Sequence, residues 1–444
     1  MFAPSRIRGS YGTHVTAKLA LKAGRALAGT GDEIVVGHDP SDSARLLADA
    51  VALGVCECGG TVHRLGPVAS PTVSHGVRRL GGDAGVAVTT VSDPDDDTAL
   101  KLFDDDGSRL SWERQSRVVR RVNGSSAEVA SWDEIGAERR WDDATTRHLD
   151  HLCDSRPSFS DTRAVVAVGE RGDGIVAEAL ERLGCDVERL TDAADDSFPR
   201  RRVADGDDVC RTLRRTVATT DADIGLAHDA DADRLVAVDE TGEVVGGDTL
   251  LGLFAREAVR DADGDARVAV PLEASRRIEE VVSDAGGSIV RVEMDGIPGS
   301  GPASSADVVF GGEPSGVYQW PDESPCPDAA LSAVRLARLV DEGAPLSEQA
   351  GDVAAYPLFF DSVAVDNCAR EMTRLATESQ ARFDDVRTDD GIFVERDDAW
   401  FVVRASRTER VLRVTVEGTS RNSAKQLFEA VWALVADERA TLVA

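Results

Sequence analysis

The stretch RAVVAVGERGDGIVAEALERLGCDVERL, residues 163–190, contains one complete folding unit of this chain. A β-branched run leads into a glycine-rich turn, then an apolar pattern with helical spacing, then a second strand-like run. The stretch DARVAVPLEASRRIEEVVSDAGGSIVRVE, residues 265–293, repeats the same order. Each stretch predicts a strand, a helix and a strand in succession, so we expect mostly parallel sheets with helices on both faces.

The same alternation is present near the N-terminus, whereas the C-terminal part has a different pattern. EIVVGHD (33–39) predicts a strand, and SARLLADAVALGVCECG (43–59) predicts the helix that follows it. Residues 399–438 contain two alternating strands and one amphipathic helix, which indicates a smaller α+β domain with an antiparallel sheet. The acidic stretch SDPDDDTALKLFDDDGS (92–108) is predicted to be a loop. The patterns together predict two or three similar α/β domains followed by this smaller domain.

The charge balance of the chain is strongly acidic. It has 80 acidic and 50 basic residues, for a formal net charge of −30, and only four of the basic residues are lysines. The acidic residues are spread along the chain, which favours a solvated acidic surface adapted to a high-salt cytoplasm over a local acidic binding surface. A nucleic-acid partner is disfavoured because phosphates would be repelled.

The remaining bulk features point to a cytoplasmic protein. The sequence contains no signal-peptide pattern and no apolar run near 18 residues, so we expect no membrane partner. The seven cysteines are scattered and odd in number, so buried thiols are expected rather than a zinc site or a disulfide framework.

Three aspartates at every second position stand out in GLAHDADADRLVAVDETGEVVGGD, residues 225–248. Asp229, Asp231 and Asp233 supply hard anionic oxygens, which suit Mg²⁺, and Arg234 adds a fork for phosphate oxygens. Apolar strands on both sides predict that the triplet lies at a sheet edge in a cleft. Carboxylates crowded there repel one another unless a cation joins them.

Two alternatives for the triplet remain. An EF-hand would use the three aspartates and Glu240, but Arg234 stands where that loop needs glycine, and LVAVDETGEVV is typical of a β-hairpin. The other alternative is an acidic loop that simply faces solvent. His228, just before the triplet, fits a structural strand-end histidine better than a proton shuttle.

Several short motifs in this order resemble the α-D-phosphohexomutase family, which includes phosphomannomutases, phosphoglucomutases and phosphoglucosamine mutases. DADADR (229–234) resembles the family's metal loop D-G-D-G-D-R. FGGEPSG (310–316) resembles its sugar loop G-E-x-S-G, and RASRTE (404–409) resembles its phosphate loop R-x-S-G-T-E. KLF (101–103) and SFP (197–199) also stand where the family has similar residues, so the resemblance covers nearly the whole chain.

The resemblance implies a fold of three similar doubly wound α/β domains plus a small C-terminal α+β domain around a central cleft. The implied domains and their loops are residues 1–145 with a nucleophile loop, 146–245 with the metal loop, 246–360 with the sugar loop and 361–444 with the phosphate loop. The implied activity moves a phosphoryl group between the 1 and 6 positions of a hexose or hexosamine phosphate, with Mg²⁺ and a phosphoserine.

The resemblance also assigns roles to individual residues. Asp229, Asp231 and Asp233 would bind Mg²⁺. Arg234 would steady the phosphoryl group, and Arg8, the arginine kept from the family's N-terminal motif, joins it among the catalytic candidates. The substrate-binding candidates are Glu313 and Ser315 for the sugar, and Arg404, Ser406 and Thr408 for the phosphate that is not transferred.

The family's nucleophile loop, T-x-S-H-N-P, corresponds here to VTTVSDP, residues 88–94. An ungapped alignment puts Val91 at the nucleophile position, and valine cannot be phosphorylated. A one-residue shift makes Ser92 the phosphate carrier, and Thr90 is a third residue with a hydroxyl. If none of them serves, the chain is a paralogue that binds sugar phosphates and regulates or partners a true mutase. We expect a monomer or a homodimer.

Overall fold

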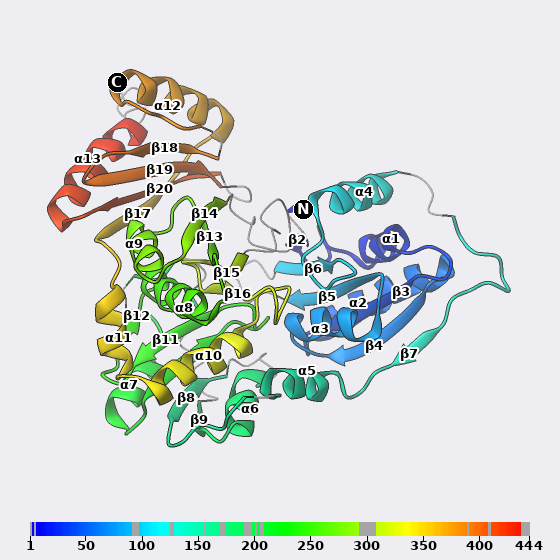
Figure 1. Cartoon of the computed structure of the whole chain (residues 1–444). Helices are drawn as coiled ribbons and strands as arrows, with labels where there is room; N and C mark the ends of the chain where they lie inside the picture. The colour runs from blue at the N-terminus through cyan, green and yellow to red at the C-terminus, as the bar shows by residue number, and fades with distance from the viewer. Residues whose placement is uncertain are drawn as a thin grey trace.

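The computed structural model describes residues 2–3, 6–90, 97–124, 128–154, 156–168, 174–190, 198–199, 202–204, 208–292, 308–388, 390–406 and 410–436. Four separate sheets lie within these residues, and Figure 1 shows them as four domains in chain order. None of the helices in the described ranges is both long enough and apolar enough to cross a membrane.

Domain I has a seven-stranded sheet in the order β1-β2-β6-β5-β3-β4-β7. Strands β3, β4, β5 and β7 are parallel, whereas β6 is antiparallel to both β5 and β2. The elements are β1 (Phe2–Ala3), β2 (Arg6–Ser10), α1 (Ala17–Leu27), β3 (Glu33–His38), α2 (Asp42–Glu57), β4 (Thr61–Pro67), α3 (Ser70–Leu80), β5 (Ala84–Thr90), β6 (Asp97–Phe103), α4 (Trp112–Asn123) and β7 (Glu138–Arg140).

Helices cover both faces of the domain I sheet. Along β3, Ile34 and Val36 pack with α1, α2 and α4, whereas Val35 packs with α3 on the opposite face. Apolar side chains fill both layers, which is why β3 and β5 appear in the sequence as nearly continuous apolar runs. The prediction of a loop over residues 92–108 is wrong for residues 97–103, which form β6. Its alternation of polar and apolar residues pairs it with both β5 and β2, and this pairing overrides the acidic composition.

Domain II is built on the sheet β12-β11-β10-β8-β9, and domain III on β14-β13-β15-β16. In each domain a parallel βαβ unit, residues 163–190 or 267–292, is extended by an antiparallel hairpin. Domain II contains α5 (Ala144–Cys153), β8 (Arg163–Ala167), α6 (Ile175–Arg182), β9 (Asp186–Leu190), α7 (Arg211–Thr219), β10 (Ile224–His228), β11 (Leu235–Asp239) and β12 (Val244–Val245). Domain III contains α8 (Gly247–Asp261), β13 (Arg267–Pro271), α9 (Arg276–Asp284), β14 (Ser288–Val292), β15 (Val308–Glu313), β16 (Val317–Gln319), α10 (Ala329–Glu342) and α11 (Leu346–Val353).

Strand β11 excludes one of the two alternatives for the aspartate triplet. An EF-hand loop would run from Asp229 to Glu240 and lead into a helix, whereas residues 235–239 within that range form β11, which pairs antiparallel with β10 and β12. The EF-hand is therefore excluded by the local fold.

Domain IV has an entirely antiparallel sheet in the order β17-β20-β19-β18. Its elements are β17 (Leu358–Ala364), α12 (Cys368–Arg382), β18 (Ile392–Glu395), β19 (Ala399–Ala405), β20 (Val411–Gly418) and α13 (Arg421–Ala436). The predicted fold class is confirmed: three α/β domains precede one smaller α+β domain.

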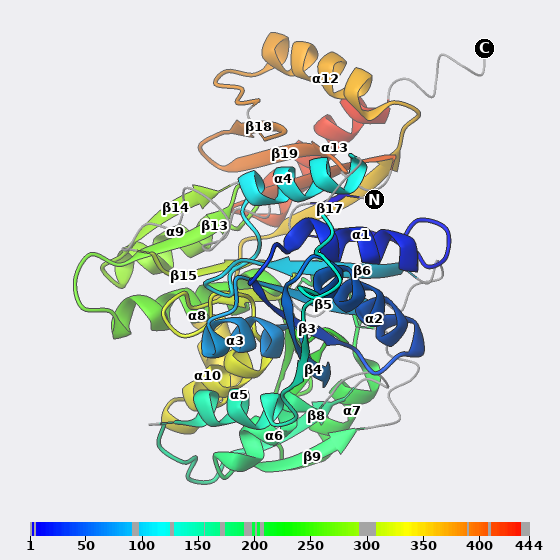
Figure 2. The same cartoon turned by 90° about the vertical axis from the view of Figure 1, so that its right-hand side faces the viewer.

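The domains differ in how they are joined. Domains II and III share one hydrophobic core, in which α6 of domain II packs against α10 of domain III. Domain I and domain IV each keep a core largely of their own. Figure 1 shows domain I to one side of the fused pair, and Figures 1 and 2 both show domain IV at one end of the molecule. Hydrogen bonds and ion pairs join domain I and domain IV to this fused pair.

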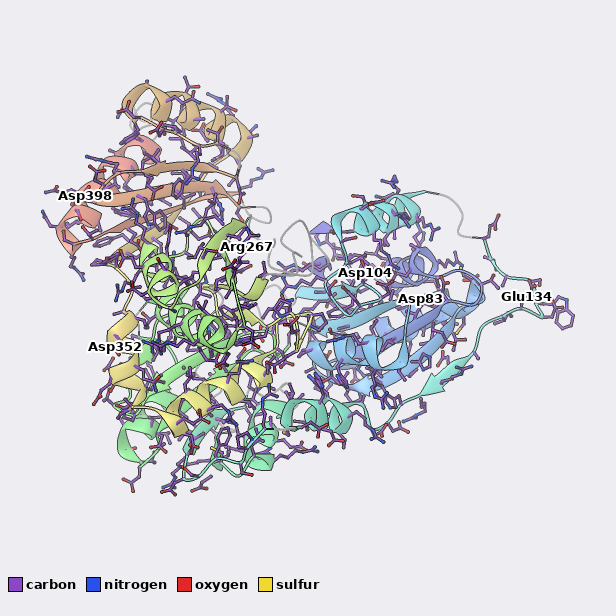
Figure 3. The ribbon with its side chains drawn as sticks, viewed as in Figure 1. Asp83, Asp104, Glu134, Arg267, Asp352 and Asp398 are labelled. Carbon is purple, nitrogen blue, oxygen red and sulfur yellow. The ribbon has the colours of Figure 1, made fainter. Side chains whose placement is uncertain are left out.

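The acidic residues are dispersed over the surface. Asp83 and Glu134 of domain I, Asp352 of domain III and Asp398 of domain IV are all exposed, and Figure 3 places them at separate positions around the molecule. The expectation of an acid excess spread over the whole protein agrees with this distribution.

A cluster of histidines lies where domain I meets domain II. His75 of α3 stacks on His148 of α5, with ring centroids 5.1 Å apart, and its centroid lies 5.2 Å from that of His151. Burial lowers the pKa of His75 to about 3, with help from the two neighbouring imidazoles, Arg78 and Arg79. The folded state therefore opposes protonation of this ring.

We predict that His75 makes the protein less stable in mild acid. Its pKa falls from 6.5 in the unfolded chain to about 3 in the folded protein, so the unfolded chain binds more protons between these values. Its contribution to stability is complete above about pH 6.5 and is lost as the pH falls toward 3. The melting temperature of His75→Gln should fall less between neutral and mildly acidic pH than that of the wild type. The exposed His14→Gln is the matched control, and a slope equal to the wild type in His75→Gln would contradict the assignment.

Candidate active site

The aspartate triplet lies in the turn between β10 and β11, at the carboxyl end of β10. The turn closes tightly because Asp229 Oδ1 accepts the backbone N–H groups of Asp233 (2.9 Å) and Arg234 (3.2 Å). Ala232 sits in the left-handed region with φ +52°, where a small side chain is least strained. The local sequence therefore keeps the three carboxylates within one tight turn.

A lysine from another domain lies between two of these carboxylates. Lys101 Nζ, from β6 of domain I, is 2.7 Å from Asp231 Oδ2 and 2.6 Å from Asp233 Oδ2. The Lys101 side chain is 13% exposed, so solvent screens the contact poorly. Burial lowers the pKa of Lys101, but the three aspartates outweigh that effect and raise it above its ordinary value. Lys101 thus provides a positive charge from domain I to the acidic loop of domain II.

Two cationic groups face the three carboxylates: the Lys101 ammonium and the Arg234 guanidinium, whose Nε is 4.0 Å from Asp229 Oδ2. Burial, together with Asp231 and Asp233, raises the pKa of Asp229 to about 7, while Arg234 and Lys101 act in the opposite direction. Burial also raises the pKa of Asp231, against the lowering effect of Lys101. The site therefore carries excess negative charge and would be stabilised by a further cation.

The donor set suits a hard divalent cation. Asp231 Oδ1 is buried and has no hydrogen-bond partner among the described residues, which is costly for a carboxylate oxygen unless a cation takes it. The carboxylates are not arranged around an ion, however: no group of three Asp, Glu, His or Cys side chains within the described ranges is set to hold a metal. Because Lys101 lies between Asp231 and Asp233, a metal would have to share these oxygens with the ammonium or displace it.

Two helix N-termini also contact the loop. The N–H of Ser70, at the start of α3 in domain I, donates to Asp231 O at 3.2 Å. The N–H of Ala329, at the start of α10 in domain III, donates to Ala232 O at 2.9 Å. The positive ends of both helices thus face the acidic turn from two other domains.

The sugar-loop candidates lie next to the aspartate turn. The N–H of Leu235 donates to Gly316 O at 2.9 Å, and Arg234 forms an antiparallel bridge with Val317. Gly316 has φ +91°, and a Cβ there would meet Leu235 O at 2.6 Å, so this close approach requires glycine. Ser315 Oγ donates to Glu313 Oε2 at 3.0 Å. Tertiary folding therefore brings Glu313 and Ser315 to the loop that carries the aspartates.

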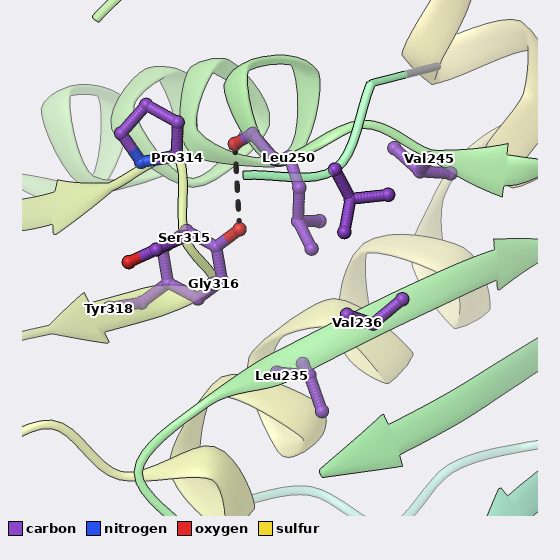
Figure 4. Close-up of a pocket in the computed structure, with 10 residues that line it drawn as sticks. Leu235, Val236, Val245, Leu250, Pro314, Ser315, Gly316 and Tyr318 are labelled. Atoms are coloured by element: carbon purple, nitrogen blue, oxygen red, sulfur yellow. Dashed lines mark hydrogen bonds between the residues drawn. The ribbon is translucent and has the colours of Figure 1, made fainter. Parts of the chain in front are cut away.

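A small cavity lies behind the sugar loop, between the hairpin β15–β16 and β11 (Figure 4). It is lined by apolar side chains such as Leu235, Val245 and Leu250, and by Pro314 and Ser315. Its volume of about 10 Å³ is close to the space of one water molecule, so it cannot hold a sugar. The cavity belongs to the packing beneath the loop and not to a substrate site.

Arg8 projects from domain I on the same side of the sheet as Lys101. In the antiparallel pairing of β2 with β6, Arg8 is opposite Ala99 and Arg6 is opposite Lys101. Residues directly opposite each other share a face, so Arg8 is two positions along that face from the lysine. The register thus places this catalytic candidate on the face that carries Lys101.

Arg404 is already bonded to two carboxylates. Its Nη1 is 2.5 Å from Glu273 Oε2 of domain III, and its Nη2 is 2.6 Å from Asp390 Oδ2 of domain IV. Only 8% of the residue is exposed. In this arrangement Arg404 joins domain IV to domain III, and a phosphate would have to replace one carboxylate. Ser406, two residues after Arg404, donates its backbone N–H to Val411 O. Thr408 lies outside the described residues.

The nucleophile candidate Ser92 and Val91, which stands at the family's nucleophile position, also lie outside the described residues, but the second candidate, Thr90, does not. Thr90 is 7% exposed, and its hydroxyl donates to Asp39 Oδ2 at 2.6 Å. Asp39 Oδ1 accepts from the hydroxyl and the N–H of Ser41. This buried network gives the Thr90 hydroxyl a structural role at the end of β5, which argues against Thr90 as a phosphate carrier.

The sequence did not assign two of the ion pairs at this site, those of Lys101 and of Glu273. Lys101 was noted only as part of the KLF motif. The rarity of lysine, with four in the whole chain, was the signal that could have singled it out. The pairing of Glu273 with Arg404 had no sequence signal, because the two residues belong to different domains.

Comparison with known families agrees with this arrangement. The four phosphoglucomutase/phosphomannomutase domain models match in chain order: α/β/α domain I over residues 1–128, domain II over 149–242, domain III over 246–356 and the C-terminal domain over 365–434. The chain therefore belongs to this family of isomerases, the α-D-phosphohexomutases, as its motifs indicated.

Individual relatives and solved structures show which members of the family the chain is similar to. The chain is 36% identical over 433 residues, 96% of its length and 95% of the relative's, to the probable phosphoglucosamine mutase of Methanopyrus kandleri. Its fold matches a phosphoglucomutase/phosphomannomutase family protein from Burkholderia thailandensis with a TM-score of 0.82 at 21% identity, over 98% of each chain. It also matches Aspergillus fumigatus N-acetylphosphoglucosamine mutase, solved with GlcNAc-6P and magnesium, with a TM-score of 0.55 at 14% identity, over 83% of this chain and 92% of that one.

We predict that Lys101→Met destabilises the protein when no divalent cation is present. The change removes the ammonium between two largely buried carboxylates, whose side chains are 13% and 15% exposed, and should lower the free energy of unfolding by about 3 kcal/mol in urea titrations. Saturating Mg²⁺ should stabilise this variant more than it stabilises the wild type. Lys22→Met, which removes a lysine that donates to Val122 O, is the control, and an equal loss in both variants would contradict the role of Lys101.

Proposed function

We propose that the protein is a Mg²⁺-dependent phosphohexomutase that interconverts the 1-phosphate and 6-phosphate of a hexosamine or hexose through a phosphoserine. One observation carries this proposal: the acidic turn of domain II is joined to Lys101 of domain I on one side and to the sugar loop of domain III on the other. Family membership and the order of the motifs support the same chemistry. The runner-up function is a paralogue that only binds sugar phosphates, and the phosphorylation experiment below tests it.

The proposed metal ligands are Asp229, Asp231 and Asp233, whose excess negative charge and unsatisfied Oδ1 atom at Asp231 favour a cation. Bound Mg²⁺ would neutralise charge on the phosphoryl group during transfer. Arg234 follows the turn and its backbone bridges to Val317, while its guanidinium lies beside Asp229, where it would share its N–H groups with phosphate oxygens. Lys101 holds the acidic turn against the domain that carries the nucleophile loop.

The proposed sugar contacts are Glu313 and Ser315. A carboxylate and a hydroxyl at 3.0 Å from each other offer acceptors and a donor for sugar hydroxyls. Because the sugar loop is bonded to the aspartate turn through Gly316, a sugar held there lies beside the proposed metal ligands. The phosphate that is not transferred is assigned to Arg404, Ser406 and Thr408, with Arg8 as a further cationic group on domain I.

The relatives' names make glucosamine phosphate the first substrate to test. The Methanopyrus kandleri relative, named a probable phosphoglucosamine mutase, matches 96% of this chain. We therefore expect turnover of glucosamine 6-phosphate to exceed turnover of glucose 6-phosphate and mannose 6-phosphate. Assays in concentrated KCl suit the acidic surface, whose charges repel one another at low salt.

We predict that Ser92 carries the phosphoryl group. Incubation with a hexose 1,6-bisphosphate and Mg²⁺ should add one phosphoryl group to the intact protein, and peptide mapping should locate it on Ser92. Ser92→Ala should abolish both the modification and mutase activity, while Thr90→Val keeps the modification. A protein that binds the bisphosphate but stays unmodified would exclude the mutase and favour the binding paralogue.

We predict that Asp231→Asn separates catalysis from stability. Removing one carboxylate should lower kcat about 100-fold or more, because one charge-stabilising group is lost. It should leave the melting temperature within about 3 °C of the wild type, because repulsion within the turn is relieved as the contact to Lys101 weakens. Asp263→Asn, which neutralises an exposed acid in the α8–β13 connection, is the matched control. Full activity in Asp231→Asn would overturn the assignment of the aspartates.

A further inference from the structure

A chain of three buried polar side chains links three domains behind the aspartate turn. Thr72 Oγ1 of α3 is 3.0 Å from His148 Nδ1 of α5, and His148 Nε2 is 3.0 Å from Asp328 Oδ2 at the start of α10. Their exposed fractions are 0%, 2% and 1%. The three residues therefore form a water-excluded chain from domain I through domain II to domain III.

The direction of these hydrogen bonds follows from their chemistry. A carboxylate oxygen accepts, so His148 Nε2 carries the hydrogen and donates it to Asp328. Nδ1 is then an acceptor and takes the hydroxyl hydrogen of Thr72. Asp328 Oδ1 meanwhile accepts the N–H groups of Ala330 (2.9 Å) and Leu331 (3.2 Å) as the N-cap of α10. Each polar atom in the chain thus has a partner, and the imidazole is fixed in one tautomer.

Both ends of this chain lie next to the residues that hold the aspartate turn. Thr72 is two residues after Ser70, whose N–H donates to Asp231 O. Asp328 directly precedes Ala329, whose N–H donates to Ala232 O. Two helices therefore hold adjacent peptide groups of the turn from opposite sides, and His148 connects the two helices.

We propose that His148 is a positioning residue that fixes α3 and α10 relative to each other and so holds the aspartate turn between domains I and III. Among the described residues, the hydrogen bonds of the His148 side chain go to Thr72 and Asp328, and its ring stacks on His75 of α3, so it acts on the turn through the two helices. Loss of the imidazole frees the start of either helix to move. Because a displacement of about 1 Å at a reacting centre can cost roughly 100-fold in rate, a small movement here has a large effect.

Hydrogen–deuterium exchange on the full chain tests this inference without any substrate. In His148→Phe, the amides of Ser70 and Ala329 and the peptide over residues 229–235 should exchange about tenfold faster than in the wild type, while strand β20 of domain IV stays unchanged. Thr72→Val, which keeps the side-chain shape, should accelerate exchange at Ser70 more than at Ala329. This second variant keeps the test decisive if His148→Phe does not fold.

The matched control is His63→Phe in domain I. His63 also pairs with a carboxylate, that of Glu33, but the pair lies between β4 and β3 and has no contact with the aspartate turn. Exchange in the turn should stay at the wild-type rate in this variant. Equal exchange in His148→Phe and the wild type, or equal acceleration in His148→Phe and His63→Phe, would overturn the positioning role.

A kinetic measurement rests on the proposed function and complements the exchange data. With glucosamine 6-phosphate and Mg²⁺, kcat of His148→Phe should fall about 10- to 100-fold while KM stays within about threefold, because the sugar loop is unchanged. Accelerated exchange together with an inactive wild type would refute the proposed function and leave the positioning role intact. Wild-type exchange rates in His148→Phe together with an active wild type would refute the positioning role and leave the proposed function intact.

Discussion

The structure depends on how three crowded carboxylates are compensated. Asp229, Asp231 and Asp233 stand within one five-residue turn, where burial and neighbouring carboxylates raise the pKa of Asp229 and Asp231. Arg234, directly after the turn, offsets part of this charge, and the other compensating groups come from outside domain II: the ammonium of Lys101 and the N-termini of α3 and α10. Because these other groups belong to domains I and III, the turn is compensated where three domains meet. Charge compensation therefore favours a position for the aspartate turn at the junction of domains I, II and III.

The way the domains are joined suits the proposed chemistry. Domains II and III share one apolar core, so the aspartate turn and the sugar loop belong to a single rigid body. The contacts of domain I with this body combine small apolar patches with polar bonds such as those of Lys101 and His148, and domain IV is joined by ion pairs such as Arg404–Glu273 beside a small apolar contact. Polar contacts of this kind can exchange partners with a charged ligand more readily than a packed core can open.

The acidic residues of the chain have different physical effects at the surface and at the aspartate turn. Exposed acids such as Glu134 and Asp398 are far apart and solvated, so salt screens them effectively. The aspartates of the turn are close together and shielded from solvent, so screening does little there and specific cations are needed. The same residue type thus contributes to solubility in one place and to cation affinity in another.

The sequence by itself determined the fold class and the chemistry of individual loops. Periodic apolar runs define strands and helices locally, so residues 163–190 and 265–293 predict their own βαβ units. The spacing of the aspartates likewise belongs to one short segment. Among the described residues, β6 was misassigned to a loop, because its acidic flanks hide a strand that pairing on both sides stabilises.

Only the tertiary structure decided which distant groups meet. Lys101 lies 130 residues before Asp231, and His148 lies 180 residues before Asp328, so no local pattern could pair them. Domain packing also bonded Arg404 to Glu273, although its motif alone indicated an open phosphate site. Local sequence sets which chemistry each residue can perform, whereas long-range packing sets which partner it has. The charge balance of the site is a sum over three domains, and for that reason it could be read only from the folded chain.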